Sequence, residues 1–204
     1  MTTYNSFKFI SNEYPLILAS ASPRRSSLLT GLGIPIKVVP STIEENDNTE
    51  DPVMFSLNIA HKKAEDVYSK IKDGWILGAD TIVVIDDNIL GKPRDYMDAK
   101  KILKRLSGRK HMVFTGFCIL NPLGRIAHME HVKSEVVIRD LDDKEIDAYL
   151  ATGEPFDKAG AYAVQGVGSF MIKGIYGSYT NVVGLPICEL ILALKKIKAI
   201  PNFP

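Results

Sequence analysis

The sequence has little cysteine and no marked excess of charge of either sign. The 204 residues include only two cysteines, Cys118 and Cys188, which lie far apart in apolar surroundings. Their spacing matches no metal-binding or redox motif, so we expect two buried free thiols in a reducing compartment. A disulfide between them is the less favoured alternative. The formal net charge of +1 excludes a global electrostatic attraction to nucleic acids or anionic membranes.

Targeting and membrane signals are missing as well. The N-terminus lacks the charged-then-apolar pattern of a signal peptide, and no apolar run approaches the length of a membrane-spanning helix. We therefore expect a soluble, cytoplasmic protein that binds neither nucleic acid nor membrane.

Several common catalytic motifs are also absent. The chain has no Walker-type loop, no HExxH, no CxxC and no G-x-S-x-G elbow, and Gly166-Val-Gly168 lacks the third glycine of a dinucleotide-binding fingerprint. Without a nucleophilic serine of this kind, any hydrolysis should use metal-activated water.

The elements that are present alternate between strand and helix patterns. We expect helices near 23–30, 53–71, 95–106, 143–152 and 187–197, with Ser22, Thr49, Asp95 and Asp142 as N-caps. Strands are expected at 16–19, 36–39, 75–85, 89–93, 111–120, 125–138, 161–164 and 170–172. This order predicts a single α/β domain over residues 1–204 with a mixed sheet, after an irregular lead-in at 1–14.

The helix expected at 23–30 carries an unusual first turn. Pro23 suits a helix start, but Arg24 and Arg25 follow it, where the helix dipole disfavours cations. Free backbone N–H groups, the dipole and two guanidinium groups would together bind an anion, with phosphate the best fit. An ordinary solvated arginine pair is the alternative.

The long helix at 53–71 distinguishes two neighbouring lysines. Its apolar residues repeat in alternating steps of three and four along one stripe. At about 100° per residue, Lys62 points away from that stripe and Lys63 falls on its flank. We expect Lys62 to be solvated and Lys63 to reach along the edge of the surface on which the helix packs.

Acidic residues supply the remaining candidates. Asp80 interrupts an apolar strand, where a buried carboxylate needs an ion-pair partner, a metal or a cleft. Glu44 or Glu45, in an acidic loop, could share Mg²⁺ or Mn²⁺ with Asp80, although such loops are usually only solvated. Lys92 could offer its ammonium group to a phosphate, which is a weak signal by itself.

Five short motifs occur in order: SASPRR at 20–25, GADT at 78–81, GKP at 91–93, KAGAY at 158–162 with QG at 165–166, and NVVGLP at 181–186. Over about residues 15–195, the chain resembles the Maf family of nucleoside triphosphate pyrophosphatases. It departs from the family's usual Asp-Gly turn at Asp86-Asp87-Asn88, which should alter only a hairpin tip.

The resemblance implies a fold similar to that of inosine triphosphate pyrophosphatases, with an elongated mixed sheet, flanking helices and two lobes around a cleft. It implies conversion of a nucleoside triphosphate to the monophosphate and pyrophosphate with a divalent cation. The implied roles are proton acceptor and metal ligand for Asp80, and metal ligand for Glu45. The resemblance further implies phosphate binding by Ser20, Arg25, Lys63 and Lys92, and nucleotide selection by Arg24, Thr81 and Gln165.

By this resemblance, the set Arg24, Thr81 and Gln165 matches the subgroup of the family that acts on dTTP and UTP. Modified pyrimidine nucleotides are further candidate substrates. A different nucleotide specificity, or a non-hydrolysing nucleotide-binding regulator of cell division, is the alternative function. The resemblance is also compatible with a homodimer, to which the sequence assigns no interface.

Overall fold

The computed structural model describes residues 7–201 and 203, and within them seven strands form one mixed sheet in the order β2-β1-β3-β5-β6-β7, with β4 paired to β3. β1 is parallel to β2 and β3, whereas β3, β5, β6 and β7 are antiparallel neighbours. The prediction of an α/β fold with a mixed sheet is confirmed. The strand bounds are β1 Leu16–Leu18, β2 Ile36–Val38, β3 Ile76–Ile85, β4 Asn88–Leu90, β5 Lys110–Leu120, β6 Ile126–Ile138 and β7 Ile172–Tyr176.

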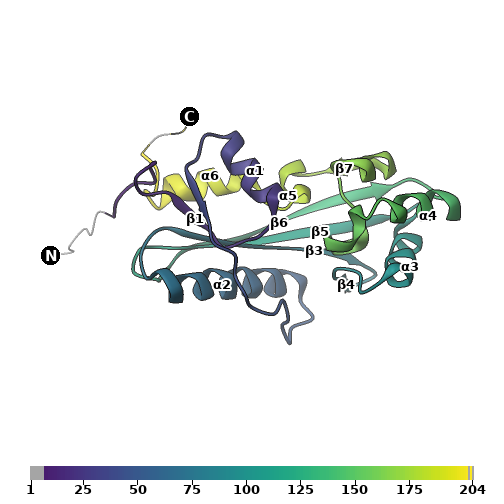
Figure 1. Cartoon of the computed structure of the whole chain (residues 1–204), viewed down its shortest axis with the longest axis horizontal. Helices are drawn as coiled ribbons and strands as arrows, with labels where there is room; N and C mark the ends of the chain where they lie inside the picture. Colours follow the sequence, from purple (N-terminus) through teal and green to yellow (C-terminus); the bar gives the residue numbers. More distant parts are fainter. Residues whose placement is uncertain (1–6, 202, 204) are drawn as a thin grey trace.

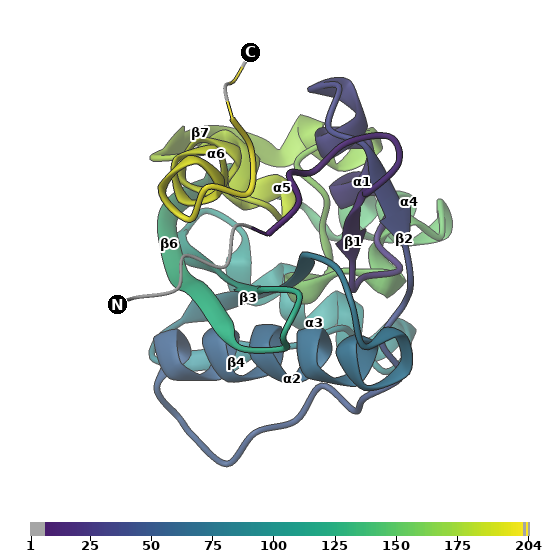
Figure 2. The ribbon, with the colours of Figure 1, turned by 90° about the vertical axis from the view of Figure 1, so that its left-hand side faces the viewer.

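Helices cover both faces of this sheet (Figures 1 and 2). The long helix α2 lies along one face, where Gly116 of β5 lets the backbones approach closely: a Cβ atom there would lie 2.6 Å from the Ser56 backbone. The opposite face carries α6 at one end and α4 at the other. The helix bounds are α1 Pro23–Gly31, α2 Pro52–Ile71, α3 Tyr96–Leu106, α4 Asp143–Ala151, α5 Tyr179–Val183 and α6 Ile187–Lys196, with 3₁₀ turns at Glu154–Asp157, Ala159–Ala161 and Val167–Met171.

Two hydrophobic cores occupy the two ends of the opposite face. One gathers side chains of β1, β3, β5, α1 and α6, among them Leu18, Leu77, Phe117 and Leu194. The other gathers side chains of β3, β5, β6, α3 and α4, among them Val83 and Tyr149. The long strands β3 and β5 therefore run through both cores.

Strand β3 has a gap in its pairing along one edge. β1 pairs with Ile76 and Leu77, and β4 pairs only from Val83 onward. Between them, Asp80 and Thr81 lie on a stretch of edge that neither strand covers. Both residues line the cleft that opens at this gap.

Helix starts agree with the sequence patterns in part. Asp95 caps α3, and Asp142 and Glu145 form a capping box at α4, as predicted. Helix α2 is capped by Asp51, which accepts from the amides of Val53 and Met54, so the Thr49 prediction is wrong. Thr49 lies outside this turn, and its hydroxyl accepts a hydrogen bond from the Asp51 amide.

Ser22 occupies the N-cap position of α1, as predicted, although its side chain makes no capping hydrogen bond. Two further expectations are wrong. Residues 161–164 are not a strand, because Ala161 follows Gly160 with φ of 57° and 72° in a 3₁₀ turn, and β7 begins only at Ile172. Cys188 is exposed, because it lies on the outer face of α6, and Cys118 is buried as expected.

The lead-in is ordered where it is described. Residues 7–14 form no helix or strand, yet the Lys8 carbonyl accepts from the Trp75 indole at 2.9 Å and Ile10 is 8% exposed. Residues 1–6 of the predicted lead-in lie outside the described residues. No helix in the described part of the chain has the length and apolar character required to cross a bilayer.

The β3–β4 hairpin allows a first prediction. Its two central residues, Asp86 and Asp87, have φ of 50° and 57°, a conformation that favours glycine. Replacing Asp87 with glycine should raise the free energy of unfolding by about 0.5 kcal/mol, measured by urea denaturation. Asp86→Gly is the control, since it also removes the ion pairs with Arg105 and Arg109 and should not stabilise. An Asp87→Gly variant that is no more stable than the parent would show that the positive φ of Asp87 costs no stability.

Candidate active site

A cleft of about 330 Å³ opens at the gap in the β3 edge. Its wall combines the start of α1, the flank of α2, β3, the loop before α3 and the 3₁₀ segment after α4. Five basic side chains and three carboxylates line it: Arg24, Arg25, Lys63, Lys92 and Lys158 with Glu45, Asp80 and Asp157. The excess of positive charge favours a polyanionic ligand.

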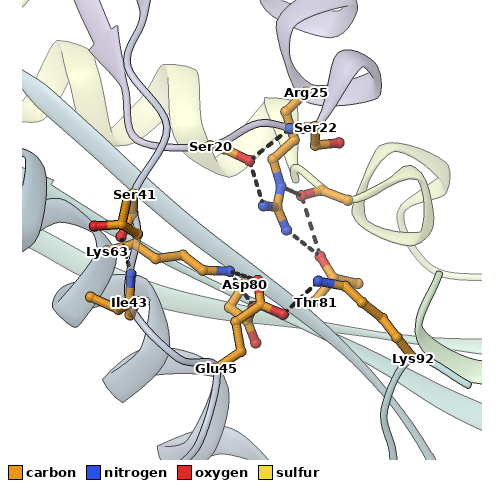
Figure 3. Close-up of polar contacts among 12 residues, drawn as sticks. Ser20, Ser22, Arg25, Ser41, Ile43, Glu45, Lys63, Asp80, Thr81 and Lys92 are labelled. Carbon is orange, nitrogen blue, oxygen red and sulfur yellow. Dashed lines mark hydrogen bonds and ion pairs between the residues drawn. The ribbon is translucent and has the colours of Figure 1, made fainter. Parts of the chain in front are cut away.

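Two carboxylates converge on one lysine in this cleft (Figure 3). The Lys63 Nζ atom lies 2.7 Å from Asp80 Oδ1 and 2.8 Å from Glu45 Oε1. Lys63 and Asp80 are each 6% exposed, so the pair offsets the cost of burying either charge. Of the alternatives left open for Asp80, the structure shows an ion-pair partner and a position in the wall of a cleft.

Glu45 joins this buried pair to the outside of the cleft. Its Oε2 atom lies 2.6 Å from the Lys92 Nζ atom, which sits in the GKP loop. Partial burial raises the pKa of Glu45, but the charges and hydrogen bonds of Lys63 and Lys92 outweigh this and lower it to about 2. Glu45 is thus a carboxylate anion at neutral pH.

Arg25 reaches the cleft from the first turn of α1, yet it is only 7% exposed. It donates from Nε to the Gly184 carbonyl at 2.7 Å, from Nη1 to Ser20 Oγ at 3.0 Å and from Nη2 to Thr81 Oγ1 at 3.0 Å. Burial lowers the pKa of Arg25, and the charges of Asp80 and Glu45 counteract this.

All three acceptors of Arg25 are neutral, so none of them cancels its charge. A guanidinium group has five N–H donors, and these bonds use three of them. Since Arg25 lines the cleft, its remaining donors suit an anionic ligand.

The residues predicted to select the nucleotide are only partly together. Arg24 lines the cleft and lies 3.6 Å from Asp157, and Thr81 lines it beside Arg25. Gln165 is exposed and is not part of the wall, although its neighbour Val164 is. The structure therefore assembles eight of the nine predicted site residues, namely Ser20, Arg24, Arg25, Glu45, Lys63, Asp80, Thr81 and Lys92.

Two charged residues of the cleft wall, Asp157 and Lys158, were not predicted from the sequence. Asp157 pairs with Arg24 and Lys158, and the Lys158 Nζ atom also donates to the Glu154 carbonyl at 2.6 Å. Lys158 is the first residue of the KAGAY motif, and this position could have identified it as a candidate site residue. The contact of Asp157 with Arg24 joins segments more than 100 residues apart, and no local pattern indicates it.

Comparison with known proteins gives consistent matches over most of the chain. A dTTP/UTP pyrophosphatase of Ruminiclostridium cellulolyticum is 48% identical over 184 residues, covering 89% of this chain and 95% of the relative. A dTTP/UTP pyrophosphatase of Syntrophotalea carbinolica is 49% identical over 191 residues, covering 92% and 87%.

A solved structure of a nucleoside-triphosphatase (dITP/XTP pyrophosphatase) from Mycobacterium abscessus matches with a TM-score of 0.44 and 15% identity, over 68% of this chain and 95% of that one. The model of the family described as Maf-like protein matches residues 15–197. With that match over most of its length and relatives at nearly half identity, this chain belongs to the Maf-like protein family.

Proposed function

We propose that this protein is a nucleoside triphosphate pyrophosphatase that converts dTTP and UTP to the monophosphate and pyrophosphate. The observation that carries the proposal is the meeting of the Asp80 carboxylate and the incompletely bonded Arg25 guanidinium in one cationic cleft. The names of the relatives support the activity and the two substrates.

The basic residues of the cleft would bind the triphosphate. Arg25 and Lys92 reach it from opposite segments, α1 and the GKP loop, and the first turn of α1 adds backbone N–H donors. These groups hold the α-phosphorus near Asp80 and stabilise the negative charge that develops on the departing pyrophosphate.

Asp80 would act as the general base. Lys63 contacts its Oδ1 atom, and no described residue donates to Oδ2, so Oδ2 can accept a proton. As a water oxygen bonds to the α-phosphorus, Asp80 takes the water proton and the bond between the α-phosphorus and the bridging oxygen breaks. The electron pair of that bond leaves with pyrophosphate.

A divalent cation fits the donor set of this site. The carboxylates of Asp80 and Glu45 already converge on a positive group, the Lys63 ammonium, and Mg²⁺ commonly takes one or two carboxylates plus substrate phosphates. Among the described residues, no group of three or more His, Cys, Asp or Glu is placed so that it could hold a metal ion, so substrate oxygens would complete the shell. Mg²⁺ or Mn²⁺ held there would polarise the phosphoryl oxygens and acidify a bound water.

Nucleotide selection would lie at Arg24 and Thr81, with Gln165 approaching from its exposed position. The two hydrophobic cores would form two lobes of one domain with the cleft between them. We also place the protein in the cytoplasm, with its nucleotide substrates, and keep a homodimer as the expected assembly.

The direct test is a pyrophosphate-release assay with Mg²⁺ or Mn²⁺ over dTTP, UTP, CTP and the purine triphosphates. We expect dTTP and UTP to have the highest kcat/KM, with CTP about 100-fold lower because its altered base edge leaves polar groups unpaired. A chelator should abolish release. If no triphosphate turns over with metal while dTTP or UTP still binds, the non-hydrolysing regulatory protein becomes the better assignment.

A further inference from the structure

A line of buried hydrogen bonds runs from Arg25 across the sheet. Arg25 donates to Thr81 on β3, and the Thr81 hydroxyl lies 2.9 Å from the Thr115 hydroxyl on β5, its direct neighbour in the strand register. Thr115 in turn donates to the backbone carbonyl of Asn181 on α5 at 3.0 Å. Thr115 and Asn181 are both 0% exposed.

The direction of these bonds follows from the number of protons. A threonine hydroxyl has one proton to donate. Thr115 gives its proton to Asn181, so it can only accept from Thr81, whose hydroxyl lies closer to Thr115, at 2.9 Å, than to the Gly184 carbonyl, at 3.3 Å. Arg25 can only donate, so Thr81 accepts from it. All the donors thus point the same way, from the guanidinium to Asn181, an arrangement in which each bond polarises the next.

Asn181 is itself anchored to the sheet. Its Nδ2 atom donates to Ser134 Oγ on β6 at 2.9 Å and to the Val113 carbonyl on β5 at 3.2 Å. These bonds hold α5 against the strands, and Gly184, the C-cap of α5, presents its carbonyl to Arg25 Nε at 2.7 Å. Two of the three bonds that orient Arg25 therefore lead back to Asn181, the first residue of the NVVGLP motif.

We propose that Thr115 and Asn181 are positioning residues that aim the free N–H groups of Arg25 at the triphosphate. A buried arginine with only neutral acceptors depends on the placement of those acceptors, since no carboxylate among the described residues pairs with it. Neither Thr115 nor Asn181 touches the substrate in this scheme. The inference rests on the proposed function, because it takes the triphosphate as the ligand of Arg25.

Thr115→Val tests this directly, since valine keeps the shape and removes the hydroxyl. We expect the Kd for tripolyphosphate, measured by calorimetry, and the KM for dTTP to rise about 10-fold, with kcat changed much less. Thr115→Ser restores the hydroxyl and should return both to within about twofold of the parent. The matched control is Ser56→Ala, which removes an equally buried hydroxyl of α2 and should leave both values unchanged.

Combination with Arg25→Ala separates positioning from general destabilisation. If Thr115 acts through Arg25, Thr115→Val should cause no further loss in that background. An equal loss with and without Arg25, or parent-like tripolyphosphate binding by Thr115→Val, would overturn the inference. Ser134→Ala, one bond further along, should shift the Kd in the same direction and substitutes for Thr115→Val if that variant does not fold.

Failure of the proposed function would look different. In that case the parent protein would bind tripolyphosphate without releasing pyrophosphate from any nucleotide, and the binding measurements would still decide the role of Thr115. A parent protein that releases pyrophosphate from dTTP or UTP but does not bind tripolyphosphate would overturn the inference alone.

Discussion

An Asp80→Asn variant is expected to lose about 10²–10⁴-fold in kcat for dTTP and to retain its affinity for the nucleotide. Asparagine keeps the size of the side chain and can still contact Lys63, but it cannot accept a proton from water. The measurement pairs kcat from pyrophosphate release with a Kd for dTTP from calorimetry. Loss in kcat without loss of binding would assign Asp80 to the chemical step.

The control for Asp80 is Asp66→Asn. Asp66 lies 2.7 Å from Lys70, the same distance as Asp80 from Lys63, but outside the cleft wall. Its loss removes a lysine–aspartate pair with the same N–O distance, and it should leave turnover unchanged because Asp66 does not line the cleft. Near-normal turnover by Asp80→Asn would remove Asp80 from the reaction.

The second large effect is expected at Lys63. Replacing it with alanine leaves the buried Asp80 without its partner, and removing one member of a buried pair costs about 3–5 kcal/mol of stability. The same change removes a cation from the phosphate-binding wall, so kcat/KM should fall at least ~10-fold. Urea denaturation and steady-state kinetics measure the two losses on the same protein.

Lys62 provides the comparison within the same turn of α2. Its Nζ atom pairs with Asp47 at 2.8 Å, and its side chain is 46% exposed. Lys62→Ala should therefore change stability by less than about 1 kcal/mol and leave the kinetics unaltered. If Lys62→Ala and Lys63→Ala had equal effects on stability and kinetics, the different orientations of the two side chains on α2 would not give them different roles.

Periodicity made this difference between neighbours predictable. A helix turns by about 100° per residue, so an apolar stripe along α2 fixes the direction of every other side chain on it. The burial of Lys63 and the exposure of Lys62 follow from that geometry. Asp80 was predictable for another reason, since a carboxylate within an apolar strand needs a partner.

The segment between α4 and β7 was not predictable in the same way. Its short 3₁₀ turns and positive-φ residues, such as Gly160 and Ala161, have no period that a sequence pattern can detect. Contacts such as Arg24 with Asp157 depend on how this segment folds back over the sheet. The exposed position of Gln165, outside the cleft wall, likewise depends on that path.

The three acceptors of Arg25 depend on tertiary structure too. The RR pair identified a candidate anion site, but its connection to Gly184 crosses more than 150 residues of sequence. Local chemistry thus indicated which residues carry charge, and only the assembled sheet indicated which of these charges are fixed in place.

The passage of β3 and β5 through both hydrophobic cores limits how the molecule can deform. A hinge between the two ends would have to bend continuous strands whose hydrogen bonds run from Ile76 to Val84. Rigid-body closure around a ligand is therefore disfavoured, and adjustment falls to the Glu45 loop, the GKP loop and the 3₁₀ segment at the rim. Such a framework would select ligands by their fit to a largely preformed cleft, with little change in the conformation of the sheet on binding.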